Sequence, residues 1–223
     1  MIRQFGLNMT RFFAAFSIAT MTVPSSGAAA PASAQEPITL VALGDSLTAG
    51  YNLPASSAFP NVLEAALRER GHNVNVINAG VSGDTAAGGL ARLDWSVPED
   101  ADGVIVALGA NDMLRGFDPA VTKEAIDGIV SRLKERGTEV LIAGMLAGRN
   151  MGAEYAERFD SIYPTVAEQY DVMLYPFFLE GVAGESSLNL DDGIHPNRAG
   201  VDLMVEQILP TVEAFIARLK PAS

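Results

Sequence analysis

Cysteine is absent from the 223 residues, and histidine occurs only twice. Without cysteine the chain forms no disulfide, carries no lipid on a cysteine and offers no thiolate to a metal ion. Its core must therefore be stabilised by packing. The two histidines, His72 and His195, are the only side chains whose ordinary pKa suits a general base near neutral pH.

Basic residues are scarce as well. Fifteen Lys and Arg stand against 27 Asp and Glu, which gives a formal net charge of −12. Such a surface repels the phosphates of nucleic acids and of anionic membranes. We therefore expect neither nucleic acid nor a membrane surface as a partner.

The first 34 residues differ in composition from the remainder. Arg3 and Arg11 precede an apolar segment at residues 12–23, and small residues follow it up to Ala34. The apolar segment is too short to span a bilayer, and this succession is typical of a secretory signal peptide. We predict that residues 1–34 are a signal peptide, that residues 35–223 form one domain, and that the mature protein is periplasmic or secreted, without stable membrane insertion. A retained anchor or a disordered cytosolic tail is the alternative.

From residue 37 onward, apolar runs rich in β-branched residues alternate with segments of helical character. The apolar runs are typical of strands buried on both faces of a parallel sheet, and they lie at 38–43, 74–77, 103–108, 140–145 and 172–175. Helices are expected at 59–70, 85–93, 119–136, 154–170 and 196–219, the last with a possible bend at Pro210. The pattern predicts an α/β fold, a three-layer α/β/α sandwich around five parallel strands.

Polar and glycine residues follow the predicted strands. Ser46 comes just after the first strand, Gly80 after the second and Asn111 after the third, while Asp192 and His195 lie in a longer loop after the fifth. In sheets of this kind, ligands bind at the carboxyl ends of the strands. These residues are therefore expected to meet at one edge of the sheet.

A serine hydroxyl becomes a nucleophile only beside a base. Asp192 precedes His195 by three residues, a spacing that lets its carboxylate reach Nδ1 and leaves Nε2 facing outward. We predict Ser46, Asp192 and His195 as catalytic residues, and the N–H groups of Ser46 and Gly80 with the Asn111 amide as the oxyanion hole. The alternative is that Asp192 caps a helix and His195 merely packs.

Other polar residues receive simpler interpretations. Asp45 and Asp112 are expected to be structural, because a carboxylate beside a turn commonly accepts local backbone hydrogen bonds. His72 lies between a predicted helix and the second strand, at the opposite edge of the sheet, and is expected to be a solvated turn residue.

Four sequence blocks occur in order at the strand ends: Gly44-Asp45-Ser46-Leu47, Gly80, Gly109-x-Asn111-Asp112 and Asp192-x-x-His195. In this respect the chain resembles the SGNH (GDSL) hydrolase superfamily. The stretches 93–95, 108–116 and 175–178 are similar to its bacterial arylesterase, acyl-CoA thioesterase and lysophospholipase branch. The resemblance implies a flavodoxin-like fold and hydrolysis of a small-molecule ester through an acyl-enzyme, without a metal or organic cofactor.

The chain departs from that branch in the loop at 147–153, where Gly148 and Ala153 replace two prolines. In the family this loop borders the acyl pocket, so the departure bears on the range of substrates. We expect Met151 and Phe177 to contact the substrate. We predict hydrolysis of aryl and short- to medium-chain acyl esters, with thioesters slower.

Three other functions remain open from the sequence. A carbohydrate O-acetylesterase would use the same machinery with a polar pocket. A non-catalytic module would bind an anion at the 44–46 turn. A purely structural exported domain would do neither.

Overall fold

The computed structural model describes residues 1, 2, 4, 6 and 36–219. By its internal contacts the chain divides into two units, Met1–Ala34 and Gln35–Ser223. The predicted signal peptide lies almost wholly outside the described residues and stays a prediction. In the part of the chain that is described, no helix is long and apolar enough to cross a membrane.

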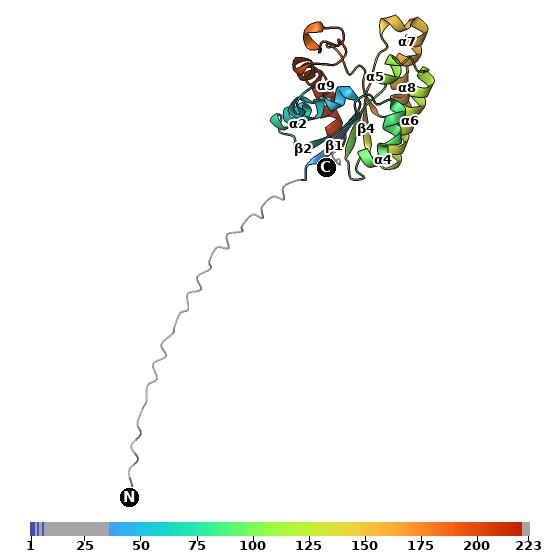
Figure 1. The fold of residues 1–223 in the computed structure, drawn as a ribbon. Coiled ribbons are helices and arrows are strands. Elements are labelled where there is room, and N and C mark those ends of the chain that lie inside the picture. The colour runs from blue at the N-terminus through green and yellow to red at the C-terminus, as the bar shows by residue number, and fades with distance from the viewer. Residues whose placement is uncertain (3, 5, 7–35, 220–223) are drawn as a thin grey trace. The chain divides into compact units, whose positions relative to one another are not determined.

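The second unit is built on five parallel strands in the order β2-β1-β3-β4-β5 (Figure 1). Their bounds are β1 Ile38–Gly44, β2 Val74–Gly80, β3 Gly103–Ala107, β4 Glu139–Ala143 and β5 Met173–Tyr175. The five predicted parallel strands are confirmed. The winding of the chain switches direction at β1, which lies between β2 and β3, and a crevice at the carboxyl ends of the strands is expected at such a switch.

Helices cover both faces of the sheet. Figure 1 shows α2 (Phe59–Glu69) and α9 (Arg198–Leu219) on one side, and α6 (Pro119–Glu135) and α8 (Ile162–Tyr170) on the other. The central strands β1, β3 and β4 are buried on both faces, as the apolar runs indicated, whereas the edge strands β2 and β5 are partly exposed. The predicted three-layer α/β/α sandwich is confirmed.

Two predicted helices are each interrupted. The segment predicted at 154–170 forms α7 (Ala153–Asp160) and α8, with Ser161 between them. Pro164 lacks the N–H that a continuous helix would donate to the Asp160 carbonyl, which accounts for the break. The segment predicted at 85–93 likewise becomes α3 (Ala86–Ala91) and α4 (Leu93–Ser96). By contrast, α9 continues through Pro210.

His72 is not simply a solvated turn residue. Its Nε2 lies 3.1 Å from a carboxylate oxygen of Glu213 on α9, and its side chain is only 22% exposed. Arg70 contacts the other oxygen of the same carboxylate. This cluster ties the end of α2 to the last helix, a tertiary contact that local sequence does not reveal.

Candidate active site

The close approach of a short helix to two strand ends fixes the position of Ser46. β1 ends at Gly44, which is paired with Gly80 at the end of β2, and Ser46 begins the one-turn helix α1 (Ser46–Ala49). A Cβ on Gly44 would lie 2.0 Å from Thr48 Oγ1, and one on Gly80 would lie 2.3 Å from the Ala49 nitrogen. Glycine at both positions therefore lets α1 sit directly on the strand ends.

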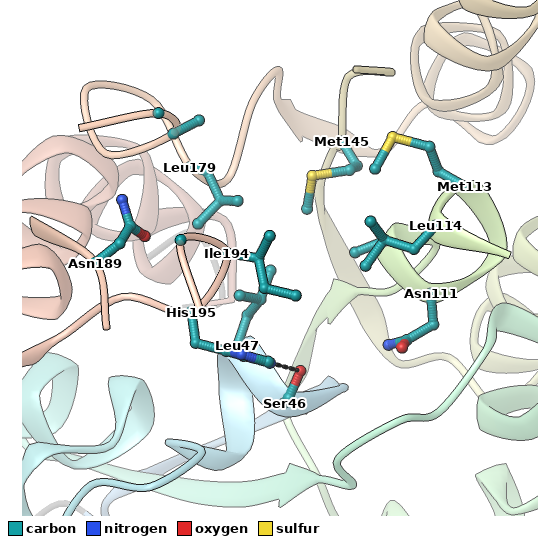
Figure 2. A pocket seen from close by; sticks show the side chains of 14 residues that line it. Ser46, Leu47, Asn111, Met113, Leu114, Met145, Leu179, Asn189, Ile194 and His195 are labelled. Atoms are coloured by element: carbon teal, nitrogen blue, oxygen red, sulfur yellow. Dashed lines mark hydrogen bonds between the residues drawn. The ribbon is translucent and has the colours of Figure 1, made fainter. Parts of the chain in front are cut away.

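The three predicted catalytic side chains meet. His195 Nε2 lies 2.9 Å from Ser46 Oγ, and His195 Nδ1 lies 2.8 Å from Asp192 Oδ2 (Figure 2 shows the first of these contacts). The other oxygen of Asp192 accepts hydrogen bonds from the backbone N–H groups of Ile194 and His195, both at 3.0 Å. Gly193, with φ of +74°, allows this tight turn.

The backbone hydrogen bonds from Ile194 and His195, together with the His195 ring, lower the pKa of Asp192 to about 2. The carboxylate is therefore ionised near neutral pH and only accepts hydrogen bonds. His195 Nδ1 must then carry the proton, and Nε2 presents its lone pair to the Ser46 hydroxyl. The ring of Tyr51 lies against the imidazole, with centroids 4.4 Å apart and planes inclined by 33°.

Asn111 lies near Ser46 on the opposite side from His195 (Figure 2). It belongs to the short helix α5 (Ala110–Leu114), which begins after Gly109, where φ is +113°. A Cβ on Gly109 would meet the Tyr163 hydroxyl at 2.2 Å, so this turn requires glycine. The Asn111 amide nitrogen donates to Asp45 Oδ2 at 3.2 Å.

The predicted backbone donor at Gly80 has an acceptor within the chain. The Gly80 N–H donates to the side-chain oxygen of Asn78 at 3.0 Å. An incoming oxyanion would have to replace or share this bond. The part of Gly80 in the oxyanion hole therefore stays a prediction, as does that of the Ser46 N–H.

Asp45 and Asp112 have the local hydrogen bonds expected of structural carboxylates. Asp45 caps α1 by accepting from the Leu47 N–H at 3.0 Å. Asp112 is fully buried and accepts from the Ala86 N–H at 2.9 Å and the Thr122 hydroxyl at 3.2 Å. The bond from Asn111 gives Asp45 a second contact that the sequence did not indicate.

A cavity of about 230 Å³ opens beside Ser46 and His195. Its walls are mostly apolar and come from α1, α5, the segment just after β4 and the loop that follows β5 (Figure 2). Besides Ser46, Asn111 and His195, the lining residues are Leu47, Ala110, Met113, Leu114, Met145, Leu179, Ala183, Gly184, Asn189, Gly193 and Ile194.

Met151 and Phe177 are not among these lining residues, and their contact with the substrate stays a prediction. Met151 ends a turn of 3₁₀ helix at Arg149–Met151, and the Gly148 N–H ahead of it donates to the sulfur of Met113, which does line the cavity. Phe177 packs against the core, as the cavity-lining Leu179 also does. The sequence located both segments at the correct edge, but side-chain direction depends on packing that no local pattern records.

The 183–189 loop was not anticipated at all. Ala183, Gly184 and Asn189 also line the cavity, and small or polar residues in a long loop carry no sequence signal for that position.

Residues 42–203 match the model of the GDSL-like lipase/acylhydrolase family. The chain belongs to this family. The arylesterase of Vibrio mimicus is 43% identical over 158 residues, covering 70% of this chain and 79% of that protein. Thioesterase 1/protease 1/lysophospholipase L1 of Escherichia coli K12 is 41% identical over 179 residues, covering 78% and 85%.

Solved structures agree with this assignment. The crystal structure of TesA superposes with a TM-score of 0.75 at 38% identity, covering 79% of this chain and 98% of that one. The chain is thus a serine esterase of the SGNH type, a carboxylic ester hydrolase.

Proposed function

We propose that Ser46, His195 and Asp192 form the catalytic triad of this esterase. The observation that carries the proposal is the position of His195, whose two ring nitrogens contact Ser46 Oγ and the Asp192 carboxylate at 2.9 and 2.8 Å. A module that only bound an anion at the 44–46 turn would have no use for a base in this place.

The reaction begins when Ser46 Oγ attacks the ester carbonyl carbon while His195 Nε2 accepts the hydroxyl proton. The tetrahedral intermediate carries its negative charge on the former carbonyl oxygen, where the Asn111 amide and the backbone N–H groups of Ser46 and Gly80 donate to it. The bond to the leaving oxygen then breaks, and Nε2 returns the proton to that oxygen. Water attacks the acyl-enzyme by the same steps, releasing the acid and restoring the serine.

The Asn111 donor acts on a charge that exists only during the reaction. Loss of one such donor in a serine protease costs on the order of 100- to 1,000-fold in kcat, and we expect Asn111→Ala to behave likewise. Because the ground-state substrate lacks the charge, KM should change little.

The substrates that fit best are aryl and short- to medium-chain acyl esters. The cavity beside Ser46 is lined by Leu47, Met113, Leu114, Met145, Leu179 and Ile194, all apolar. Thioesters and lysophospholipids, which the Escherichia coli relative's name suggests for that protein, are further candidates with the same acyl chemistry. An acetylated sugar would gain little from these walls.

The nucleophile is tested with Ser46→Ala and a fluorophosphonate probe. We expect the native protein to be labelled at Ser46 and to hydrolyse p-nitrophenyl esters, and the folded Ser46→Ala variant to do neither. Ser131→Ala is the matched control. Ser131 lies on α6, far in sequence from Ser46, and its hydroxyl contacts Glu135. Undiminished turnover by Ser46→Ala would overturn the triad, and cleavage of acetylated sugars alone would favour the O-acetylesterase.

We also propose that the protein acts in the periplasm or outside the cell. The charged, apolar and small-residue succession in residues 1–34 supports this. Expression of the full chain in a Gram-negative host should yield a periplasmic or secreted protein whose N-terminus is Gln35, and cytosolic protein that keeps residue 1 would contradict it.

A further inference from the structure

One buried carboxylate has no part in the hydrolytic scheme above. Asp45 is 1% exposed and directly precedes Ser46. One oxygen accepts from the Leu47 N–H at 3.0 Å, which caps α1, and the other accepts from the Asn111 side-chain amide at 3.2 Å. Capping alone would be served by Ser, Thr or Asn at this position, without burying a charge.

The polarity of the second bond has a consequence for the oxyanion hole. An ionised carboxylate can only accept hydrogen bonds, so it faces the NH₂ end of the Asn111 amide and disfavours the carbonyl end. Nδ2 has two hydrogens, and with one directed to Asp45 the second remains for the oxyanion. If the amide were turned over, its carbonyl oxygen would replace the donor and repel the developing charge.

We propose that Asp45 is a positioning residue that selects the catalytically competent orientation of the Asn111 amide. The proposal rests on the proposed role of Asn111 as an oxyanion donor. Asp45 itself touches no reacting atom and acts through Asn111.

Protonation of Asp45 should weaken this selection, because a carboxylic acid can donate to the amide oxygen and so stabilise the turned-over orientation. Burial raises the pKa of Asp45 to about 6, against the lowering effect of its hydrogen bonds to Leu47 and Asn111. The titratable groups that face it are His195, Asp112 and Tyr163, and the Arg92 guanidinium binds the adjacent Gly44 carbonyl.

The test is a double-mutant cycle between Asp45→Asn and Asn111→Ala, followed on a p-nitrophenyl ester at pH 8. Asn at position 45 keeps the cap on α1 but presents a donor to Asn111, which reverses the preferred amide orientation. We expect kcat to fall by between about tenfold and the roughly 100-fold of a lost oxyanion donor, with KM nearly unchanged. In the Asn111→Ala background, Asp45→Asn should cost no more than about twofold, because no amide is left to orient.

Asp112→Asn is the matched control. Asp112 is an equally buried carboxylate next to Asn111 in sequence, but its hydrogen bonds go to Ala86 and Thr122. The fold-change in kcat that Asp112→Asn causes should be the same in the native background and in the Asn111→Ala background. Asp45→Ser, which also caps α1 and leaves the amide unheld, serves if Asp45→Asn does not fold.

Additive losses in the cycle, an unchanged kcat in Asp45→Asn, or a change confined to KM would each overturn the positioning role while leaving the triad intact. An Asn111→Ala variant with undiminished kcat would contradict both the assignment of Asn111 to the oxyanion hole and this inference. Fluorophosphonate labelling of Ser46 reports on the triad separately.

Discussion

Two neighbouring carboxylates, Asp191 and Asp192, precede His195, and the structure gives only the second a hydrogen bond to the ring. Because backbone N–H groups hold the pKa of Asp192 near 2, this carboxylate stays ionised throughout the pH range in which an esterase works. The loss of activity in acid should therefore follow the protonation of groups other than Asp192.

Asp192→Asn should lower kcat far more than Asp191→Asn does. An amide at position 192 cannot stabilise the imidazolium and permits the wrong ring tautomer, a change that costs about 10⁴-fold in a serine protease. Steady-state kinetics of the two variants on one ester give the comparison. Equal losses, or a larger loss at 191, would show that the other carboxylate orients His195.

Asp45 should make the folded protein less stable at high pH than a neutral residue would. Burial raises its pKa from the ordinary 3.8 to about 6, so the folded state binds the proton more tightly than the unfolded chain does. Keeping the charge buried then costs up to about 3 kcal/mol above pH 6, and this cost disappears as the pH falls towards 4.

Asp45→Asn is therefore expected to raise the free energy of unfolding at pH 8 and to leave it almost unchanged at pH 4. Urea unfolding at both pH values measures the difference. A gain that is the same at the two pH values would mean that the effect comes from packing and not from the charge. A stabilised but slower variant would show that the charge is kept at this position for catalysis.

At the scale of elements, each loop at the carboxyl edge of the sheet supplies one part of the site. The β1–α1 turn carries Ser46, and α5 carries Asn111. The loop that ends at Pro196 carries Asp192 and His195. The loop after β5 contributes Leu179 to the cavity, and the N–H of the preceding Phe178 donates to the Gly144 carbonyl at 2.8 Å, which anchors this loop. Substrate range is thus set on loops that a rigid sheet positions.

Leu179→Ala should reduce kcat/KM for hexanoyl and octanoyl esters more than for acetyl esters. Each methylene that loses its apolar contact forfeits up to about 0.8 kcal/mol, or roughly fourfold. Met151→Ala, at a residue that does not line the cavity, is the comparison. A chain-length profile altered by Met151→Ala and not by Leu179→Ala would contradict this expectation and support Met151 as the residue that contacts the acyl chain.

The net charge of −12 acts at the scale of the whole molecule. It repels a polyanionic leaving group such as coenzyme A, and salt screens that repulsion as the Debye length falls from about 30 Å at 0.01 M to about 8 Å at 0.15 M. For a medium-chain acyl-CoA we expect kcat/KM to rise over this range of salt, whereas a neutral p-nitrophenyl ester of the same acyl chain should show little change. A fall for the acyl-CoA would reveal a local basic site that outweighs the overall charge.

The sequence by itself determined the layers of the fold and the edge that carries the site. Strands buried on both faces appear in the sequence as continuous apolar runs, and helices appear as apolar residues spaced three or four apart. Both patterns lie within one segment of the chain, so the sequence alone reveals them. The spacing of Asp192 and His195 also predicted their contact, because a tight turn of three residues at Gly193 brings the carboxylate beside the ring.

Only the tertiary structure decided which side chains face the cavity and what holds Asn111. Met145 and Leu179 line the cavity whereas Met151 and Phe177 are not among its lining residues, and Asp45 meets Asn111 across 66 residues of chain. These outcomes depend on rotamers chosen by packing between separate elements, and on hydrogen bonds between groups that are distant in sequence. A local pattern places a residue at an edge, but only the assembled neighbours fix the direction of its side chain.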